Sequence, residues 1–288
     1  MDKVHIFRYS IRLSIQKMLT LRAVGVYVIL LFYSSFLESP VKEYLTAMGA
    51  KISPWLFPHM LSNGSYQLVI AFLSIYFFSD TPFLVKYEAN QIARCGRIKW
   101  LAAHILSMIE TSAAFSIICY MISNLVLFPC LEWNCGWGAA IKTLALTNVT
   151  DMYGSPVLFS YQLVAGQEPI KITIITLFIV ALNGMFLGSI MLAAGLAFNR
   201  ICSVVFATLI PMWSVIVYNM GYYARQRMSY TAPILWMGVA DIGNRTYGMY
   251  ILPPYKYIFA ALTGGIIGLS ILSLFLIKRK DCNFENED

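Results

Sequence analysis

The stretch ITIITLFIVALNGMFLGSIMLAAGLAFNRICSVVFATLIPMWSVIVYN, from Ile172 to Asn219, is a run of 48 residues with one charged side chain, Arg200. A helix needs about 20 apolar residues to cross the hydrocarbon core of a bilayer, so this run is too long for one span. The polar pair Asn199-Arg200 interrupts it near its middle. We therefore expect two membrane-spanning helices joined by a tight polar turn.

The rest of the chain has the same apolar character. Of its 288 residues, 59% are hydrophobic and 12% are charged, whereas soluble domains carry about 25% charged residues. A globule of this size could not bury so much apolar surface, which indicates that its solvent is lipid. We predict a single all-α integral membrane domain over residues 1–288. Its six spans lie near 21–38, 62–82, 100–129, 172–198, 201–219 and 257–277.

The distribution of Lys and Arg predicts the orientation. If the N-terminus is cytoplasmic, segments 1–22, 84–100, 199–200 and 278–288 hold 13 Lys/Arg in 52 residues, and the external segments hold 8 in 102. Cytoplasmic loops of membrane proteins are enriched in Lys and Arg. Both termini are therefore expected in the cytoplasm, and the net charge of +7 indicates topology and anionic headgroups rather than nucleic-acid binding.

The first twenty residues show a helical pattern. Val4, Phe7, Ile11, Ile15 and Met18 recur at steps of three and four, and the polar or basic residues fall on the other side. This pattern predicts an amphipathic helix over 4–20 that lies along the cytoplasmic membrane interface. The alternative is a cytosolic extension of the first span. The residues of the polar side are His5, Arg8, Arg12 and Gln16.

A second basic stretch, FFSDTPFLVKYEANQIARCGRIKW, runs from Phe77 to Trp100 between two apolar segments. Lys86, Asn90, Arg94 and Arg97 are spaced by four, four and three residues, which places them on one side of a helix over 84–99. Asp80 precedes this helix, where a carboxylate can accept unpaired backbone N–H groups as a cap. We interpret the helix as a cytoplasmic docking element. The alternative is a loop whose charges only anchor the topology.

Residues "FSDTPF" and the later "R-x-G-R-x-K-W" pattern, placed between the second and third spans, resemble the type-2 permeases of bacterial ABC transporters. The resemblance implies a coupling helix that docks on a separate ATP-binding subunit, with Lys86, Glu88, Arg94 and Arg97 as the contacts. It also implies a second permease copy, as a homodimer or a heterodimer, in the bacterial plasma membrane. ATP and Mg²⁺ would then belong to the partner subunit.

The sequence lacks the motifs of several enzyme classes. It has no G-x-x-x-x-G-K-[ST] phosphate loop and no H-E-x-x-H, and its three histidines are scattered, so we expect no ATPase site, no metal site and no catalytic residue in this chain. ATP hydrolysis, if the chain is part of a pump, is expected in another subunit. The aromatic and Met-rich external segments and the few charges of the spans favour an amphipathic or hydrophobic cargo, such as a peptide, toxin, antibiotic or lipid. We expect the direction to be export.

One polar cluster lies at membrane depth. His104, Ser107, Glu110 and Thr111 share a helical face in the third span, and Glu110 lies about 15 Å from the cytoplasmic edge. A carboxylate there is costly unless it is neutral, paired or hydrated. The cluster is either part of the transport path or a point where Glu110 hydrogen-bonds a neighbouring helix.

Glu110 also supports rival functions. An ATP-independent secondary transporter or channel would use it as a proton or ion site. A membrane enzyme would use His104 and Glu110 as an acid–base pair, and a membrane scaffold or immunity protein would transport nothing. Elsewhere, Cys130 and Cys135 lie close together on an expected external loop. In an oxidising compartment their spacing allows either a disulfide or two free thiols.

Overall fold

A computed structural model of the chain describes residues 3–79, 92, 95–147, 152–246 and 249–279. Within these residues, five helices are long and apolar enough to cross a membrane. The lengths range from 19 to 31 residues, which is about 29 to 46 Å at 1.5 Å per residue. These helices are α2 (Leu21–Met48), α6 (Arg97–Leu127), α10 (Pro169–Ala197), α11 (Arg200–Tyr218) and α13 (Tyr255–Arg279).

The apolar run that opens the sequence forms two helices, as predicted. α10 ends at Ala197 and α11 begins at Arg200. Between them, Asn199 caps α11 by accepting a hydrogen bond from the Cys202 backbone N–H at 2.9 Å. A side-chain oxygen at this position satisfies a backbone donor that has no partner within the helix. Asn199 therefore allows the chain to reverse within a short polar turn.

The segment expected as the second span is shorter than the others. α4 runs over Gly64–Phe78, which is about 22 Å. Asn63 caps its start by accepting hydrogen bonds from the backbone N–H groups of Ser65 and Tyr66. Most of α4 is buried against α2, α10 and α11. A sixth membrane crossing therefore stays a prediction.

The first span extends further than the sequence suggested. The predicted segment 21–38 stops before Pro40, but α2 continues through this proline to Met48. Proline has no N–H group, so the helix loses one hydrogen bond at this turn without ending. The helix ends where Gly49 takes a left-handed conformation at φ 61°, which glycine adopts without a steric cost.

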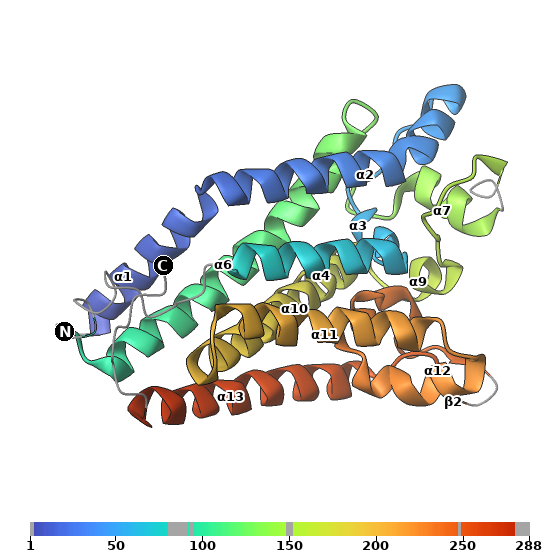
Figure 1. Cartoon of the computed structure of the whole chain (residues 1–288). Coiled ribbons are helices and arrows are strands. Elements are labelled where there is room, and N and C mark those ends of the chain that lie inside the picture. The colour runs from blue at the N-terminus through green and yellow to red at the C-terminus, as the bar shows by residue number, and fades with distance from the viewer. Residues whose placement is uncertain (1–2, 80–91, 93–94, 148–151, 247–248, 280–288) are drawn as a thin grey trace.

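The long helices run between two different ends of the bundle (Figure 1). One end carries α1 (Lys3–Met18), the start of α6, the α10–α11 turn and the last turn of α13. We call it the basic end. Its cations include Arg22, Arg97, Lys99, Arg200, Lys278 and Arg279.

The opposite end, which we call the capped end, carries the short elements α3 (Phe57–Met60), α7 (Gly138–Leu146), α9 (Tyr161–Gly166) and α12 (Tyr222–Met228). Three 3-10 turns follow α12: η1 (Ser229–Thr231), η2 (Pro233–Met237) and η3 (Val239–Asp241). One feature was not predicted. β1 (Arg245–Thr246) and β2 (Met249–Tyr250) pair as short antiparallel strands.

α10 holds the bundle together because it packs against α4, α6, α11 and α13. Gly184 and Gly188 lie one turn apart on its buried face. A Cβ atom at Gly184 would lie 3.0 Å from the Ser112 hydroxyl of α6, and one at Gly188 would lie 3.5 Å from the Phe78 ring of α4. These small residues allow three helices to approach closely, a common way of packing helices in lipid.

Candidate functional site

Glu110 lies where α1 packs against α6. The Ser10 hydroxyl donates a hydrogen bond to Glu110 Oε1 at 2.9 Å, and the Ser14 hydroxyl lies 2.7 Å from Oε2. Ser14 is also 3.1 Å from the Ser107 hydroxyl. Bonds to a carboxylate are stronger than those between neutral groups. We call Ser10, Ser14, Ser107 and Glu110 the serine clamp, because they join two helices about a hundred residues apart in the chain.

The clamp defines three faces of α1. Ser10 and Ser14 are buried against α6. The predicted apolar stripe points away from α6, and the exposed fractions of Phe7 and Ile15 are 55% and 52%. Arg8, Arg12 and Gln16 are also exposed, as the helical pattern predicts. An exposed apolar face beside a basic face fits a helix at the membrane interface, and that location stays a prediction.

The other members of the predicted polar cluster have different surroundings. Thr111 is buried and donates back to the Ser107 carbonyl of its own helix at 2.7 Å. His104 is buried against Trp100, with 4.4 Å between the ring centroids. Neither ring nitrogen of His104 has a hydrogen-bond partner. The structure thus brings Ser107 and Glu110 together with α1, whereas His104 and Thr111 lie outside the serine clamp. A role of these four residues in transport stays a prediction.

Of the four predicted docking residues, Arg97 lies within the described part of the chain. Its guanidinium lies 3.4 Å from the Ile277 carbonyl and 3.3 Å from the Lys278 carbonyl, at the end of α13. A cation is favourable beside the carbonyls at a helix C-terminus. Arg97 therefore joins the start of α6 to the end of α13. Lys86, Glu88 and Arg94, together with the predicted cap Asp80, lie outside the described residues.

The chain enters α6 through a glycine. Gly96 has φ +82°, and its N–H donates to the Ile92 carbonyl at 2.8 Å. Ile92 and Cys95 are helical. A positive φ of this size is favourable for glycine, and α6 starts at the next residue. The basic stretch that the sequence singled out therefore leads directly into the helix that carries the serine clamp.

The two cysteines of the predicted external loop are both free thiols in the structure. Cys130 follows α6, and its carbonyl accepts a hydrogen bond from the Ile52 backbone at 2.9 Å. Cys135 is exposed. The disulfide is therefore not formed here. Within the described residues, no group of three or more His, Cys, Asp or Glu side chains could hold a metal ion.

Sequence reasoning missed a second carboxyl group at membrane depth, Glu38. It stood at the edge of the first predicted span, whereas in the structure it lies inside α2 with an exposed fraction of 0%. Neither of its oxygens has a hydrogen-bond partner. A sequence signal was present, since an acid directly follows an apolar run at Leu37. The predicted span ended at Glu38, so the sequence did not indicate that the helix continues beyond it.

Comparison of the chain with protein-family models, with curated proteins and with solved structures gave no match.

Proposed function

We propose that this chain is the transmembrane subunit of an ATP-driven ABC transporter, whose ATP-binding subunit docks at the basic end. One observation carries the proposal. The basic stretch before Gly96 leads into α6, which is tied to α13 at its first residue, Arg97, and to α1 further along by the serine clamp. A force applied to this stretch would reach three helices through direct hydrogen bonds.

The proposed mechanism is alternating access. Closure of two ATP-binding subunits would push the stretch before α6 and shift the first three spans against the last three. Such a shift requires that the motor makes different contacts with the two states of the bundle. The serine clamp would make α1 move together with α6, and the Arg97 contact would transmit the motion to the last turn of α13.

The proposed cargo is amphipathic or hydrophobic, and the proposed direction is export. Large apolar side chains are exposed along the spanning helices, including Phe32, Phe178 and Leu209, and charged groups are few. A second copy of the permease and a second ATP-binding subunit would complete the transporter in the plasma membrane of a bacterium.

The test is purification of the chain from its native membrane in mild detergent, followed by mass spectrometry of the bound proteins. We expect a stoichiometric partner with a G-x-x-x-x-G-K-[ST] loop and ATPase activity. Lys86→Glu combined with Arg94→Glu should release it. These positions are preferred to Arg97, since reversing Arg97 also breaks its contact with α13.

A matched control reverses two exposed cations at the capped end, Arg227→Glu and Lys256→Glu. This variant changes the net charge by the same amount and should keep the partner. If the chain purifies without an ATPase and still transports cargo, the proposal is wrong. Equal loss of the partner in both double variants would also contradict docking at the basic end.

A further inference from the structure

The buried side of α2 carries a row of polar side chains near the capped end. Ser34, Glu38 and Lys42 follow one another at steps of four residues, so they lie on the same side of the helix. The Ser34 hydroxyl lies 3.2 Å from the Tyr66 hydroxyl of α4. Lys42 donates to the Val126 carbonyl of α6 at 2.9 Å. The outer members of the row thus have partners on two neighbouring helices, and Glu38 between them has none.

The contrast with Glu110 shows how unusual Glu38 is. The Glu110 carboxylate is only partly buried and accepts hydrogen bonds from two serines. Glu38 is completely buried, and both of its oxygens lack a partner. An ionised carboxylate without a partner in an apolar interior is very costly, so such a group takes up a proton. In the arrangement seen here, Glu38 is therefore the neutral acid.

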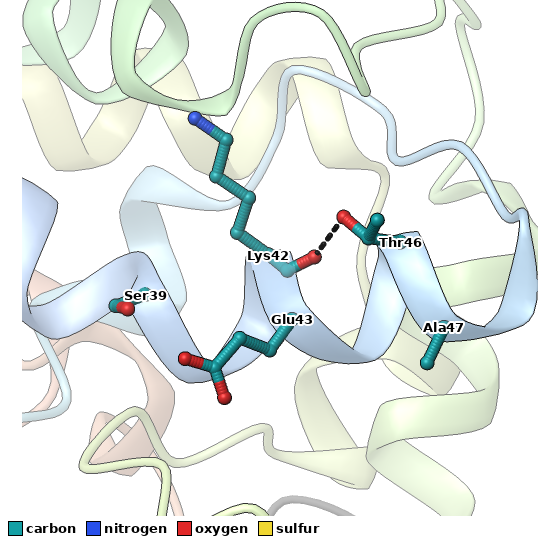
Figure 2. A pocket seen from close by; sticks show the side chains of 5 residues that line it. All are labelled: Ser39, Lys42, Glu43, Thr46 and Ala47. Atoms are coloured by element: carbon teal, nitrogen blue, oxygen red, sulfur yellow. Dashed lines mark hydrogen bonds between the residues drawn. The ribbon is translucent and has the colours of Figure 1, made fainter.

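Lys42 has two acceptors within its reach. One is the Val126 carbonyl, one residue before α6 ends at Leu127, where helix carbonyls lack partners of their own. The other is Glu38, one turn away on the same helix, which is the spacing of helical ion pairs. Figure 2 shows the Lys42 side chain pointing away from the carboxylate of the neighbouring Glu43. While Glu38 is neutral, the Val126 carbonyl is the better acceptor.

We propose that Glu38 is a proton-binding site whose charge state decides the partner of Lys42. With the proton bound, Lys42 holds the outer part of α2 to the end of α6 through Val126. When the carboxyl group releases its proton to solvent, the carboxylate attracts the Lys42 ammonium group, which leaves Val126. The contact between α2 and α6 at the capped end then opens. The proton is the ligand, and no other reactant is needed.

The route for the proton lies next to Lys42. A shallow hollow of about 510 Å³ on α2, open to the outside, is lined by Ser39, Lys42, Glu43, Thr46 and Ala47 (Figure 2). The Thr46 hydroxyl there donates to the Lys42 carbonyl at 2.8 Å. Lys42 therefore borders this hollow and lies one helical turn from Glu38, so the buried carboxyl group is one residue of the row away from solvent.

Glu38 can be the group that changes charge only if the other titratable groups around it keep the same charge over the same pH range. Tyr66 of α4, whose hydroxyl lies beside Ser34, interacts electrostatically with Glu38, with the Cys119 thiol of α6 and with the Tyr33 hydroxyl of α2. Phenols and thiols are neutral at physiological pH, and Cys119 is itself completely buried. Lys42 is the one cation among these described neighbours. The change of charge thus belongs to Glu38.

The first experiment measures the proton directly. Infrared spectra of the full chain in lipid nanodiscs, with ¹³C-labelled glutamate, are compared between the wild type and Glu38→Gln. We expect a protonated carboxyl band at neutral pH that is absent from Glu38→Gln and present in Glu43→Gln. Glu43 is the matched control, because it is an exposed glutamate one residue after Lys42. An ionised Glu38 at neutral pH would overturn the proposal.

The second experiment measures the contact. Spin labels on Ala47→Cys and Leu125→Cys, both exposed positions, report the distance between α2 and α6 from about pH 5 to about pH 9. The distance should increase at alkaline pH in the wild type and in Glu43→Gln, and it should not change in Glu38→Gln. Lys42→Met should remove the pH response but keep the infrared band. The same pH response in Glu38→Gln as in the wild type would refute the switch, whatever the ATPase experiment shows.

Discussion

At the scale of single residues, the two carboxyl groups at membrane depth differ in their hydrogen-bond partners. Glu110 accepts hydrogen bonds from hydroxyl groups of another helix, and Glu38 is buried without a hydrogen-bond partner. This difference arises from the side chains that surround each carboxyl group in the fold. It does not arise from the local sequence, since Glu38 and Glu110 both follow apolar residues. A carboxyl group in a predicted span therefore indicates a candidate functional position. Its role depends on which groups of the neighbouring helices hydrogen-bond to it.

Glu110→Ala should loosen α1 from α6, because it removes the acceptor of both serine hydroxyls. Hydrogen bonds to a charged group contribute about 1.5–3 kcal/mol each, so amide hydrogen exchange in α1 should become at least about tenfold faster. Glu110→Gln is the control, since its amide oxygen still accepts a bond, and it should show a smaller effect. Unchanged exchange in α1 of Glu110→Ala would mean that the clamp does not hold the helix.

His59 makes the capped end sensitive to acid. Its ring is completely buried in α3 between Trp137 and Phe159, and burial lowers its pKa from 6.5 to about 3. The folded state therefore binds fewer protons than the unfolded state between these two values. Stability should be complete above pH ~6.5 and should fall by about 1.4 kcal/mol per pH unit as the pH decreases toward the folded pKa.

Thermal unfolding in detergent at a series of pH values checks this prediction. His59→Phe keeps an aromatic ring in the same surroundings but cannot bind a proton, so its stability should depend less on pH in this range. If both proteins lose stability in parallel on acidification, His59 is not the group responsible.

At the scale of elements, hydrophobic length predicted the helices well. The boundaries of α6, α10, α11 and α13 lie within a few residues of the predicted spans, since a membrane sets a minimum length that the sequence shows directly. The continuation of α2 through Pro40 was not predictable in this way. It depends on the tertiary contacts of Val41, Tyr44 and Leu45, which are all buried. A hydrogen bond from Glu110 to a neighbouring helix was one of the predicted alternatives, and the structure shows it, but the partners Ser10 and Ser14 carry no strong signal on their own.

Glycines of the spanning helices should tolerate a larger side chain only where no neighbouring helix is in close contact. Gly184 of α10 and Gly268 of α13 allow this comparison. Gly184→Val would force a side chain against the Ser112 hydroxyl, which donates to the Ala181 carbonyl. Overpacking of this kind costs about 1–3 kcal/mol. Gly268→Val is the matched control, since a Cβ atom there meets nothing within 4 Å. In chemical or thermal unfolding, Gly184→Val should be clearly less stable than Gly268→Val. Equal stabilities of the two variants would contradict the close packing at Gly184.

α1 should place its apolar face in lipid. An environment-sensitive fluorophore on Ile15→Cys is expected to report an apolar surrounding in nanodiscs, and the same label on Arg12→Cys should report water. Both positions are exposed within the chain, so burial against α6 cannot explain a difference between them. Equal, water-like signals from the two labels would show that α1 extends into the cytosol instead.

At the scale of the whole molecule, the bundle is asymmetric. Polar contacts join α6 to α1 and to α13 toward its basic end, and its capped end is covered by the short helices α3, α7, α9 and α12. The distribution of Lys and Arg predicted which segments gather at the basic end, because charge can be read along the sequence. The contacts that join the helices could not be predicted, since Ser14 and Glu110, or Arg97 and Lys278, are close only after folding.

The most direct measurement of the central claim is photo-crosslinking from the basic end in native membranes. A photoreactive amino acid replaces Arg94 in one variant and the exposed Tyr223 of the capped end in the other. The account predicts that position 94 crosslinks to a protein with an ATP-binding phosphate loop and that position 223 does not. If neither position captures an ATPase, or if only position 223 does, the chain is not driven by a motor docked at its basic end.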